Sequence, residues 1–114
     1  MTTTKKTSKT TEERPEATPP ERRSAYRQKR EAQIAELAAR LDVWEAKARQ
    51  AKAEARVRYR EELDELRGRI DTARMRMSLL KDAGEDAWDE VRAGADAAMK
   101  ELRRAFRRAS SKFD

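Results

Sequence analysis

The sequence predicts an all-α protein built on a long amphipathic helix or coiled coil. Ala, Glu, Lys, Leu and Arg make up 69 of the 114 residues, more than the roughly 50% typical of coiled coils and long helices. Leu, Ile, Val and Phe number only 14, about 12% of the chain and below the roughly 20% at which a compact core becomes doubtful. No proline follows Pro20. Together these observations favour extended helices over a globule.

Residues 1–18 form the first segment, rich in Thr, Lys and Pro and without a large apolar residue after Met1. Such a composition predicts a disordered tail. The sequence Thr18-Pro19-Pro20-Glu21 then has the Thr-x-x-Glu spacing of a capping box, with proline in the first helical turn. We therefore expect the first helix to begin at residue 19.

Residues 19–82 are predicted to form one long helix, because their apolar residues step alternately by three and four, as in a heptad seam. The steps of four from Ala51 through Ala55 and Tyr59 to Leu63 act as a stutter, which unwinds a supercoil locally without ending the helix. Favourable i,i+4 pairs would support this helix. They are Glu36 with Arg40, Glu45 with Arg49, Glu54 with Arg58, and Glu65 with Arg69.

Residues 83–113 form the last predicted helix, in which an eleven-residue repeat aligns Ala87–Val91 with Ala98–Leu102. The joint near 82–86 contains Gly84, which could end one helix, and Asp82-x-x-Glu85, which could cap the next. The apolar pattern passes through this joint without a slip. A continuous or kinked helix is therefore favoured over a tight hairpin.

The apolar seam leaves a narrow uncovered stripe on a solitary helix, which predicts self-association into a homo-oligomer. The helix orientation and the number of chains stay open. The predicted oligomer seam consists of Ile34, Leu37, Leu41, Trp44, Tyr59, Leu63, Leu66, Ile70, Met77, Leu80, Trp88, Val91, Met99, Leu102, Phe106 and Phe113.

Catalysis is not expected, because a chain without His or Cys has neither an imidazole base nor a thiolate nucleophile. The acidic clusters lack the spacing of a calcium loop, and no glycine-rich phosphate loop is present. We therefore expect no catalytic residues, cofactor, metal or small-molecule substrate. The sequence also contains no signal peptide and no transmembrane segment, which predicts a cytoplasmic protein.

Four arginines near the C-terminus are candidate anion-binding residues: Arg103, Arg104, Arg107 and Arg108. Guanidinium groups around Phe106 could bind phosphates of lipid headgroups or of nucleic acid. The alternative is that these cations only complement the negative end of a helix dipole, and we favour that interpretation. Peripheral binding of an anionic membrane through helix 87–113 stays open as an alternative function. Nucleic-acid binding is possible but less favoured, because no recognisable reading motif accompanies the charge.

Several landmarks between residues 24 and 113 resemble small bacterial coiled-coil proteins of a cyanobacterial stress-response type. The most distinctive is Glu85-Asp86-Ala87-Trp88-Asp89-Glu90-Val91-x-x-Gly94; the others are Tyr26, Ala32-Gln33, Trp44-x-Ala46, Ala48, Tyr59-x-x-x-Leu63-x-x-Leu66 and Lys112-Phe113. Met99 stands where such proteins often carry a second Trp. The resemblance implies a cytoplasmic, non-enzymatic scaffold or binder in stress tolerance, with no catalytic residues.

Overall fold

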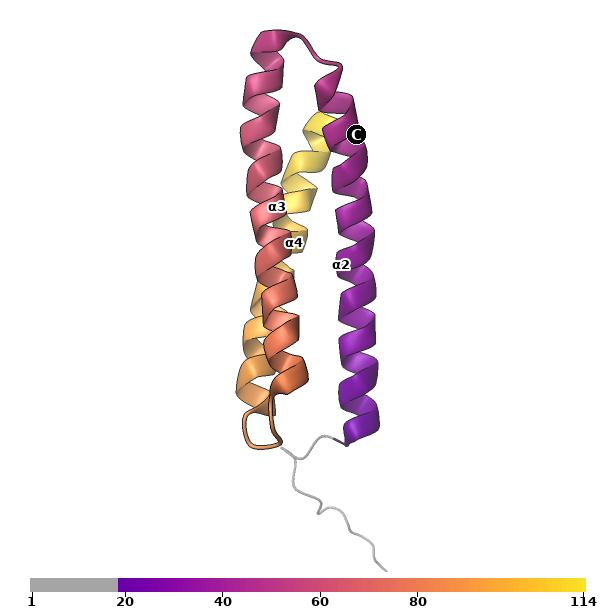
Figure 1. Cartoon of the computed structure of the whole chain (residues 1–114), viewed down its shortest axis with the longest axis vertical. Coiled ribbons are helices and arrows are strands. Elements are labelled where there is room, and N and C mark those ends of the chain that lie inside the picture. Colours follow the sequence, from indigo (N-terminus) through magenta and orange to yellow (C-terminus); the bar gives the residue numbers. More distant parts are fainter. Residues whose placement is uncertain (1–18) are drawn as a thin grey trace, which may run out of the picture.

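The computed structural model describes residues 19–114, which fold into three α-helices that run back and forth along one axis (Figure 1). They are α2 (Pro20–Arg49), α3 (Ala53–Asp82) and α4 (Trp88–Phe113). Helices α2 and α3 lie antiparallel, and α4 returns antiparallel to α3 behind the pair. The all-α prediction is confirmed, and no strand occurs within this described range. The predicted disordered tail, 1–18, lies outside it.

The prediction of one helix over 19–82 is wrong, because the chain reverses at residues 50–52. Each of the two helices is 30 residues long, which corresponds to about 45 Å at 1.5 Å per residue. A helix of that length cannot bury its apolar stripe alone. The reversal packs the apolar stripe of α3 against the apolar stripe of α2. A single chain can therefore bury the stripe that would be exposed on a solitary helix.

The joint between the last two helices is a second reversal, made by residues 83–87. The preference for a continuous or kinked helix was therefore wrong, and the predicted helix 83–113 begins at Trp88 instead. Ala87, and not the expected Asp82, occupies the N-cap position of α4, and no side chain caps that helix. Pro19 occupies the N-cap position of α2, and the capping box expected there depends on Thr18. Thr18 lies outside the described residues. Asp89 and Glu90 in the first turn of α4 still complement its dipole.

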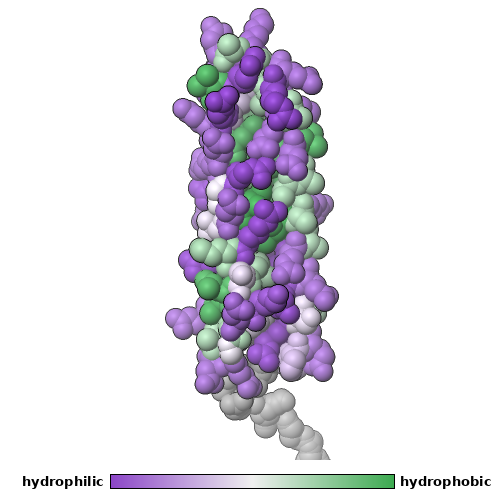
Figure 2. Space-filling view, viewed as in Figure 1, coloured by the Kyte–Doolittle hydropathy of each residue, from purple (hydrophilic) through white to green (hydrophobic). Residues whose placement is uncertain are grey.

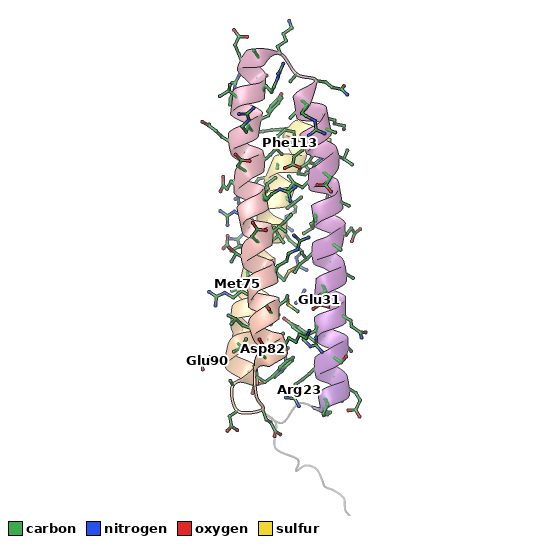
Figure 3. The ribbon with its side chains drawn as sticks, viewed as in Figure 1. Arg23, Glu31, Met75, Asp82, Glu90 and Phe113 are labelled. Atoms are coloured by element: carbon green, nitrogen blue, oxygen red, sulfur yellow. The ribbon has the colours of Figure 1, made fainter. Side chains whose placement is uncertain are left out.

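The core is a single cluster of side chains contributed by all three helices. Leu41, Ile70 and Leu102 are 0% exposed, and no polar or charged residue of the described range is buried. Charged side chains instead extend outward along all three helices (Figure 3), and the face formed by α2 and α3 is largely hydrophilic with small hydrophobic areas between the helices (Figure 2). The charged residues of the described range thus form the solvated exterior of a thin apolar core.

Candidate functional site

The residues predicted as an oligomer seam all lie in this intramolecular core. Leu37, Tyr59 and Val91 are partly buried against it, and the other thirteen are buried within it. The periodicity therefore identified the buried face of each helix, which within a single chain packs against that chain's other helices. Self-association stays a prediction, and it has lost the uncovered stripe that motivated it.

Five of the six aromatic side chains lie between α2 and α4. Of the three helix pairs, this is the one whose backbones make the fewest close approaches. At one end, Tyr26 packs edge-on against Trp88, with ring centroids 6.1 Å apart. The Tyr26 hydroxyl donates a hydrogen bond to Asp96 Oδ1, and Arg30 Nη2 lies 3.2 Å from the same oxygen. We call these four residues the first clamp.

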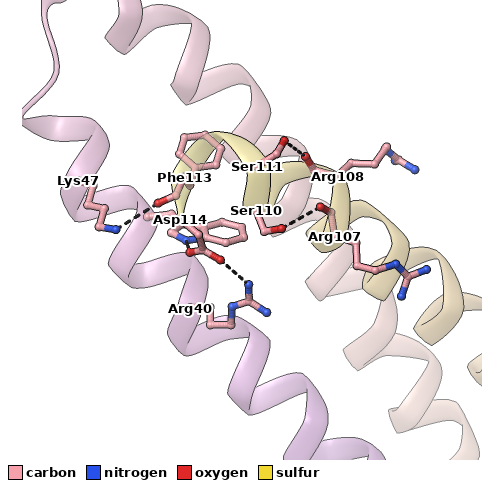
Figure 4. A network of polar contacts seen from close by, with 9 residues as sticks. Arg40, Lys47, Arg107, Arg108, Ser110, Ser111, Phe113 and Asp114 are labelled. Atoms are coloured by element: carbon pink, nitrogen blue, oxygen red, sulfur yellow. Dashed lines mark hydrogen bonds and ion pairs between the residues drawn. The ribbon is translucent and has the colours of Figure 1, made fainter.

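A second clamp holds the other end of α4 and consists of Arg40, Trp44, Phe106 and Asp114. Trp44 stacks on Phe106 with centroids 5.2 Å apart, and its Nε1 donates to Asp114 Oδ1 at 2.8 Å. Arg40 Nη2 is 3.0 Å from Asp114 Oδ2. Next to this clamp, Lys47 Nζ donates to the carbonyl of Phe113 (Figure 4).

The two clamps repeat at a fixed interval along both helices. Tyr26 and Trp44, Trp88 and Phe106, and Asp96 and Asp114 are each 18 residues apart. Eighteen residues are five turns of an α-helix, so the repeated side chains return to the same face. In each clamp, an aromatic side chain of α2 and an arginine four residues away both donate hydrogen bonds to one carboxylate, which is Asp96 within α4 or Asp114 at its C-cap. The repeat therefore sets the register of two parallel helices.

Hydrogen bonding and burial shift the acidity of one group in each clamp. The hydrogen bond from Trp44, and then that from Arg40, hold the pKa of Asp114 below its ordinary value of 3.8. Burial, and then the hydrogen bond to Asp96, raise the pKa of Tyr26 above 10.0. The second clamp is thus built for an ionised Asp114 and the first for a protonated tyrosine.

The four predicted anion-binding residues, Arg103, Arg104, Arg107 and Arg108, are all exposed on α4. Only Arg104 forms an ion pair among them, at 3.4 Å from Glu101. Phe106 does not join them at the surface, because it is 2% exposed and stacked on Trp44. Trp88 and Phe113 are likewise buried, at 3% and 6% exposure. In the folded bundle, the apolar face of helix 87–113 is therefore closed to a membrane.

The folding pattern adds cations from the other two helices to those of α4. Lys112 contacts Glu62, and Phe113 packs on Trp44 and Tyr59, which places the C-terminal part of α4 against the halves of α2 and α3 nearest their turn. We call residues 44–63 and 103–114 the cationic end. It carries 11 Lys and Arg against 5 Asp and Glu, whereas the rest of the described chain carries 13 against 14. The cations are Lys47, Arg49, Lys52, Arg56, Arg58, Arg60, Arg103, Arg104, Arg107, Arg108 and Lys112.

Sequence reasoning missed the contributions of α2 and α3 to this end, together with Asp96 and Asp114 in the clamps. The α2 and α3 cations join the site only because the chain reverses at 50–52, which was not predicted. Asp96 lies in an Ala-rich stretch and Asp114 directly follows Phe113, and neither belongs to a motif that marks it as a hydrogen-bond acceptor. The 18-residue interval between the aromatic residues was a signal that could have revealed the pairing of α2 with α4.

No group of three or more Asp, Glu, His or Cys in residues 19–114 could hold a metal ion. The surface grooves are small, about 310 Å³ between Glu31, Arg74 and Lys81 and about 340 Å³ between Arg49, Arg60 and Asp64. No helix of the described part is both long and apolar enough to cross a membrane.

The chain was compared with protein families, with curated proteins and with solved structures. No match was found in any of the three comparisons. The resemblance to stress-response proteins therefore stays a prediction from the residues alone. Any functional proposal depends on the geometry and charge of the bundle itself.

Proposed function

We propose that this protein is a non-enzymatic binding protein whose cationic end docks on anionic membrane surfaces. The observation that carries the proposal is the charge distribution. The cationic end has a net charge of +6, and the remainder of the described chain has a net charge of −1. Each Lys or Arg near an anionic bilayer contributes on the order of 1 kcal/mol to adsorption. A few side chains engaged at once would be enough for reversible docking.

The proposed contact is electrostatic and needs no inserted aromatic residue. Val57 is the exposed large hydrophobic side chain of the cationic end, at 62% exposure, and it lies between Arg56 and Arg58. Trp44, Phe106 and Phe113 lie in the core behind the cations. Single-stranded nucleic acid is less favoured, because its non-specific binding uses exposed aromatic rings on which bases stack. The resemblance would place such docking in bacterial stress tolerance and in the cytoplasm.

The test is co-sedimentation with vesicles of mixed phosphatidylcholine and phosphatidylserine over a series of salt concentrations. We expect binding that weakens as salt rises, since surface charges are screened within about 10 Å at 0.1 M salt. A variant with Arg103, Arg104, Arg107 and Arg108 changed to Gln should lose most of it. A matched variant with Arg22, Arg27, Arg74 and Lys81 changed to Gln removes the same charge from the opposite end and should bind nearly as well as the unmodified protein.

Two results would contradict the proposal. Equal losses in the two variants would show that net charge, and not the cationic end, causes adsorption. Absence of vesicle binding together with salt-dependent retention of duplex DNA would show that the partner is nucleic acid.

Tryptophan emission gives a separate readout, because Trp44 and Trp88 are buried at 1% and 3% exposure. Charge-driven docking should leave their emission unchanged, whereas insertion of α4 would require the bundle to open.

A further inference from the structure

The turn between α2 and α3 is made of residues that favour helix. Gln50, Ala51 and Lys52 include none of the Gly, Pro, Asn, Asp or Ser residues that normally form turns. All three are good helix formers, and so is the surrounding sequence Ala46–Arg56. The chain therefore reverses direction where its local preference is to continue as a helix.

The geometry of this turn is correspondingly close to helix. Gln50 keeps αR dihedral angles, φ −92° and ψ −3°, whereas Lys52 is extended at φ −64° and ψ 157°. Lysine is not a favoured N-cap residue, and no side chain caps α3. The Arg56 guanidinium donates two hydrogen bonds to the Ala51 carbonyl, at 3.2 and 3.3 Å. Rotation of a few backbone angles around Ala51 and Lys52 would join α2 and α3 into one helix.

The apolar stripe would stay in phase if the two helices joined. Ala48, Ala51, Ala55 and Tyr59 follow one another at steps of three and four. In the bundle Ala48 is buried, and Ala51, Ala55 and Tyr59 are half-buried on the inner side. The second turn differs, since it contains Gly84 and is followed by acidic residues that complement the N-terminus of α4. Only the turn at 50–52 conflicts with its own sequence.

We propose that the partner of this chain is a second copy, bound by exchange of α2 when the turn at 50–52 straightens. Two helices covering 20–82 would lie antiparallel around a two-fold axis near Ala55, the midpoint of contacts such as Arg67 with Asp42, each about 95 Å long. Every α2–α3 contact of the bundle would then form between copies, including Arg67 with Asp42 and Glu45. Domain swapping of this kind needs no new interface, because it reuses the contacts of the closed monomer.

Both clamps would also become contacts between the two copies. Helix α4 follows α3 through the turn at 83–87, so it stays with its own α3 and packs on the α2 of the other copy. The Trp44–Asp114 hydrogen bond and the Tyr26–Asp96 hydrogen bond would each join two chains. No apolar surface of the closed monomer is left uncovered by the exchange.

Charge sets the condition under which the exchange is favoured. The swapped dimer brings two cationic ends together at its centre, so Lys52, Arg56 and Arg58 of one copy approach the same residues of the other. Like charges at this spacing repel, and salt screens the repulsion. We therefore expect the dimer fraction to rise with protein concentration and with salt. This inference is independent of membrane docking, because it concerns a protein without any anionic surface present.

The test uses two single-cysteine variants, Glu45→Cys and Arg67→Cys, which are clean because the chain has no cysteine of its own. Residues 45 and 67 face each other across α2 and α3. The two variants are unfolded together, refolded at high concentration in high salt, and treated with a short bismaleimide. We expect a covalent dimer of the two variants from this mixture. Variants that are refolded separately and then mixed briefly at low concentration should give far less.

A hinge variant supplies the matched control. Ala51→Gly with Lys52→Asn adds a helix breaker and an N-cap residue for α3, so it favours the closed turn, and the covalent dimer should fall about tenfold. Lys52→Gln alone removes the same charge without a cap and should not lower dimer formation. Sedimentation as a monomer at every concentration and salt would overturn the proposal. A dimer without cross-linking between residues 45 and 67 would overturn it as well, because its contacts would not be those of the exchange.

Discussion

Two tryptophans occupy comparable places in the bundle but differ at one atom. Trp44 Nε1 donates a hydrogen bond to Asp114, whereas Trp88 Nε1 is buried without a hydrogen-bond partner. A buried donor without an acceptor is costly, and removing it can be neutral or favourable. The two side chains therefore stabilise the fold by different balances of packing and hydrogen bonding.

Replacing each tryptophan by phenylalanine separates these contributions. Trp44→Phe should lower the free energy of unfolding by about 1 kcal/mol more than Trp88→Phe does, since only the first change breaks a hydrogen bond. Denaturant titration followed by far-UV circular dichroism measures both. Equal losses would mean that the Trp44–Asp114 bond adds nothing to stability.

The pKa of Asp114 predicts how the second clamp responds to acid. This pKa is lower in the folded protein than in the unfolded chain, so the clamp is at full strength above pH 3.8 and weakens as the pH falls through the folded value. The stability difference between the unmodified protein and Asp114→Asn should be constant near pH 6 and shrink toward pH 2. Thermal unfolding at several pH values measures it. A difference that persists at pH 2 would contradict an ionised Asp114 in the clamp.

Ion pairs show where residue-level reasoning from sequence stops. Of the four predicted i,i+4 pairs, Glu65 with Arg69 is present at 3.0 Å. Glu45 instead contacts Arg67 of α3 at 2.9 Å, and Arg40 contacts Asp114 of the second clamp. Spacing along one helix predicts which side chains can meet on that helix. It carries no information on carboxylates that another helix brings closer.

At the scale of elements, the middle of α3 holds a glycine with no packing role. Gly68 is exposed, and a Cβ added there would meet nothing within 4 Å. Gly68→Ala should therefore stabilise the protein by about 0.5–1 kcal/mol, because alanine loses less conformational entropy in a helix. Gly94→Ala on α4 is the companion change, where the Cβ would make an ordinary 3.5 Å contact with Arg76. Thermal unfolding should show a gain for both, and a loss at Gly68 would mean that this position needs a glycine.

The turns were the least predictable elements. Gly84 and its acidic neighbours allowed a break near 82–86 to be foreseen, although its sharp reversal was not. Nothing in Gln50-Ala51-Lys52 signals a turn, because the reversal is stabilised by burial of distant side chains such as Leu41, Trp44, Leu63 and Ile70 in a shared core and not by local preference. Helix content and the buried face of each helix were predictable, because the 3.6-residue spacing of apolar residues is a local property of the sequence.

At the scale of the whole molecule, folding should depend on Leu66 and Ile70, which are 4% and 0% exposed in the core that all three helices share. Changing both to Asp places unpaired charges among apolar side chains, at a cost above about 4–5 kcal/mol that approaches the total stability of a small domain. Far-UV circular dichroism should show loss of most helix at any protein concentration. Met75→Asp with Leu79→Asp, at positions 53% and 47% exposed, is the control and should stay folded.

A rod with its charge at one end is also an electric dipole along its length. The start of α2 lies at the end of the bundle opposite the turn at 50–52, so the cationic end and the start of α2 lie at opposite ends of the molecule (Figure 1). Molecules that approach a negatively charged plane would rotate before contact and stand upright on it, with residue 19 facing the solution. Many such molecules side by side would form a brush. Residue 19 would then be held about one helix length, roughly 45 Å, away from the surface.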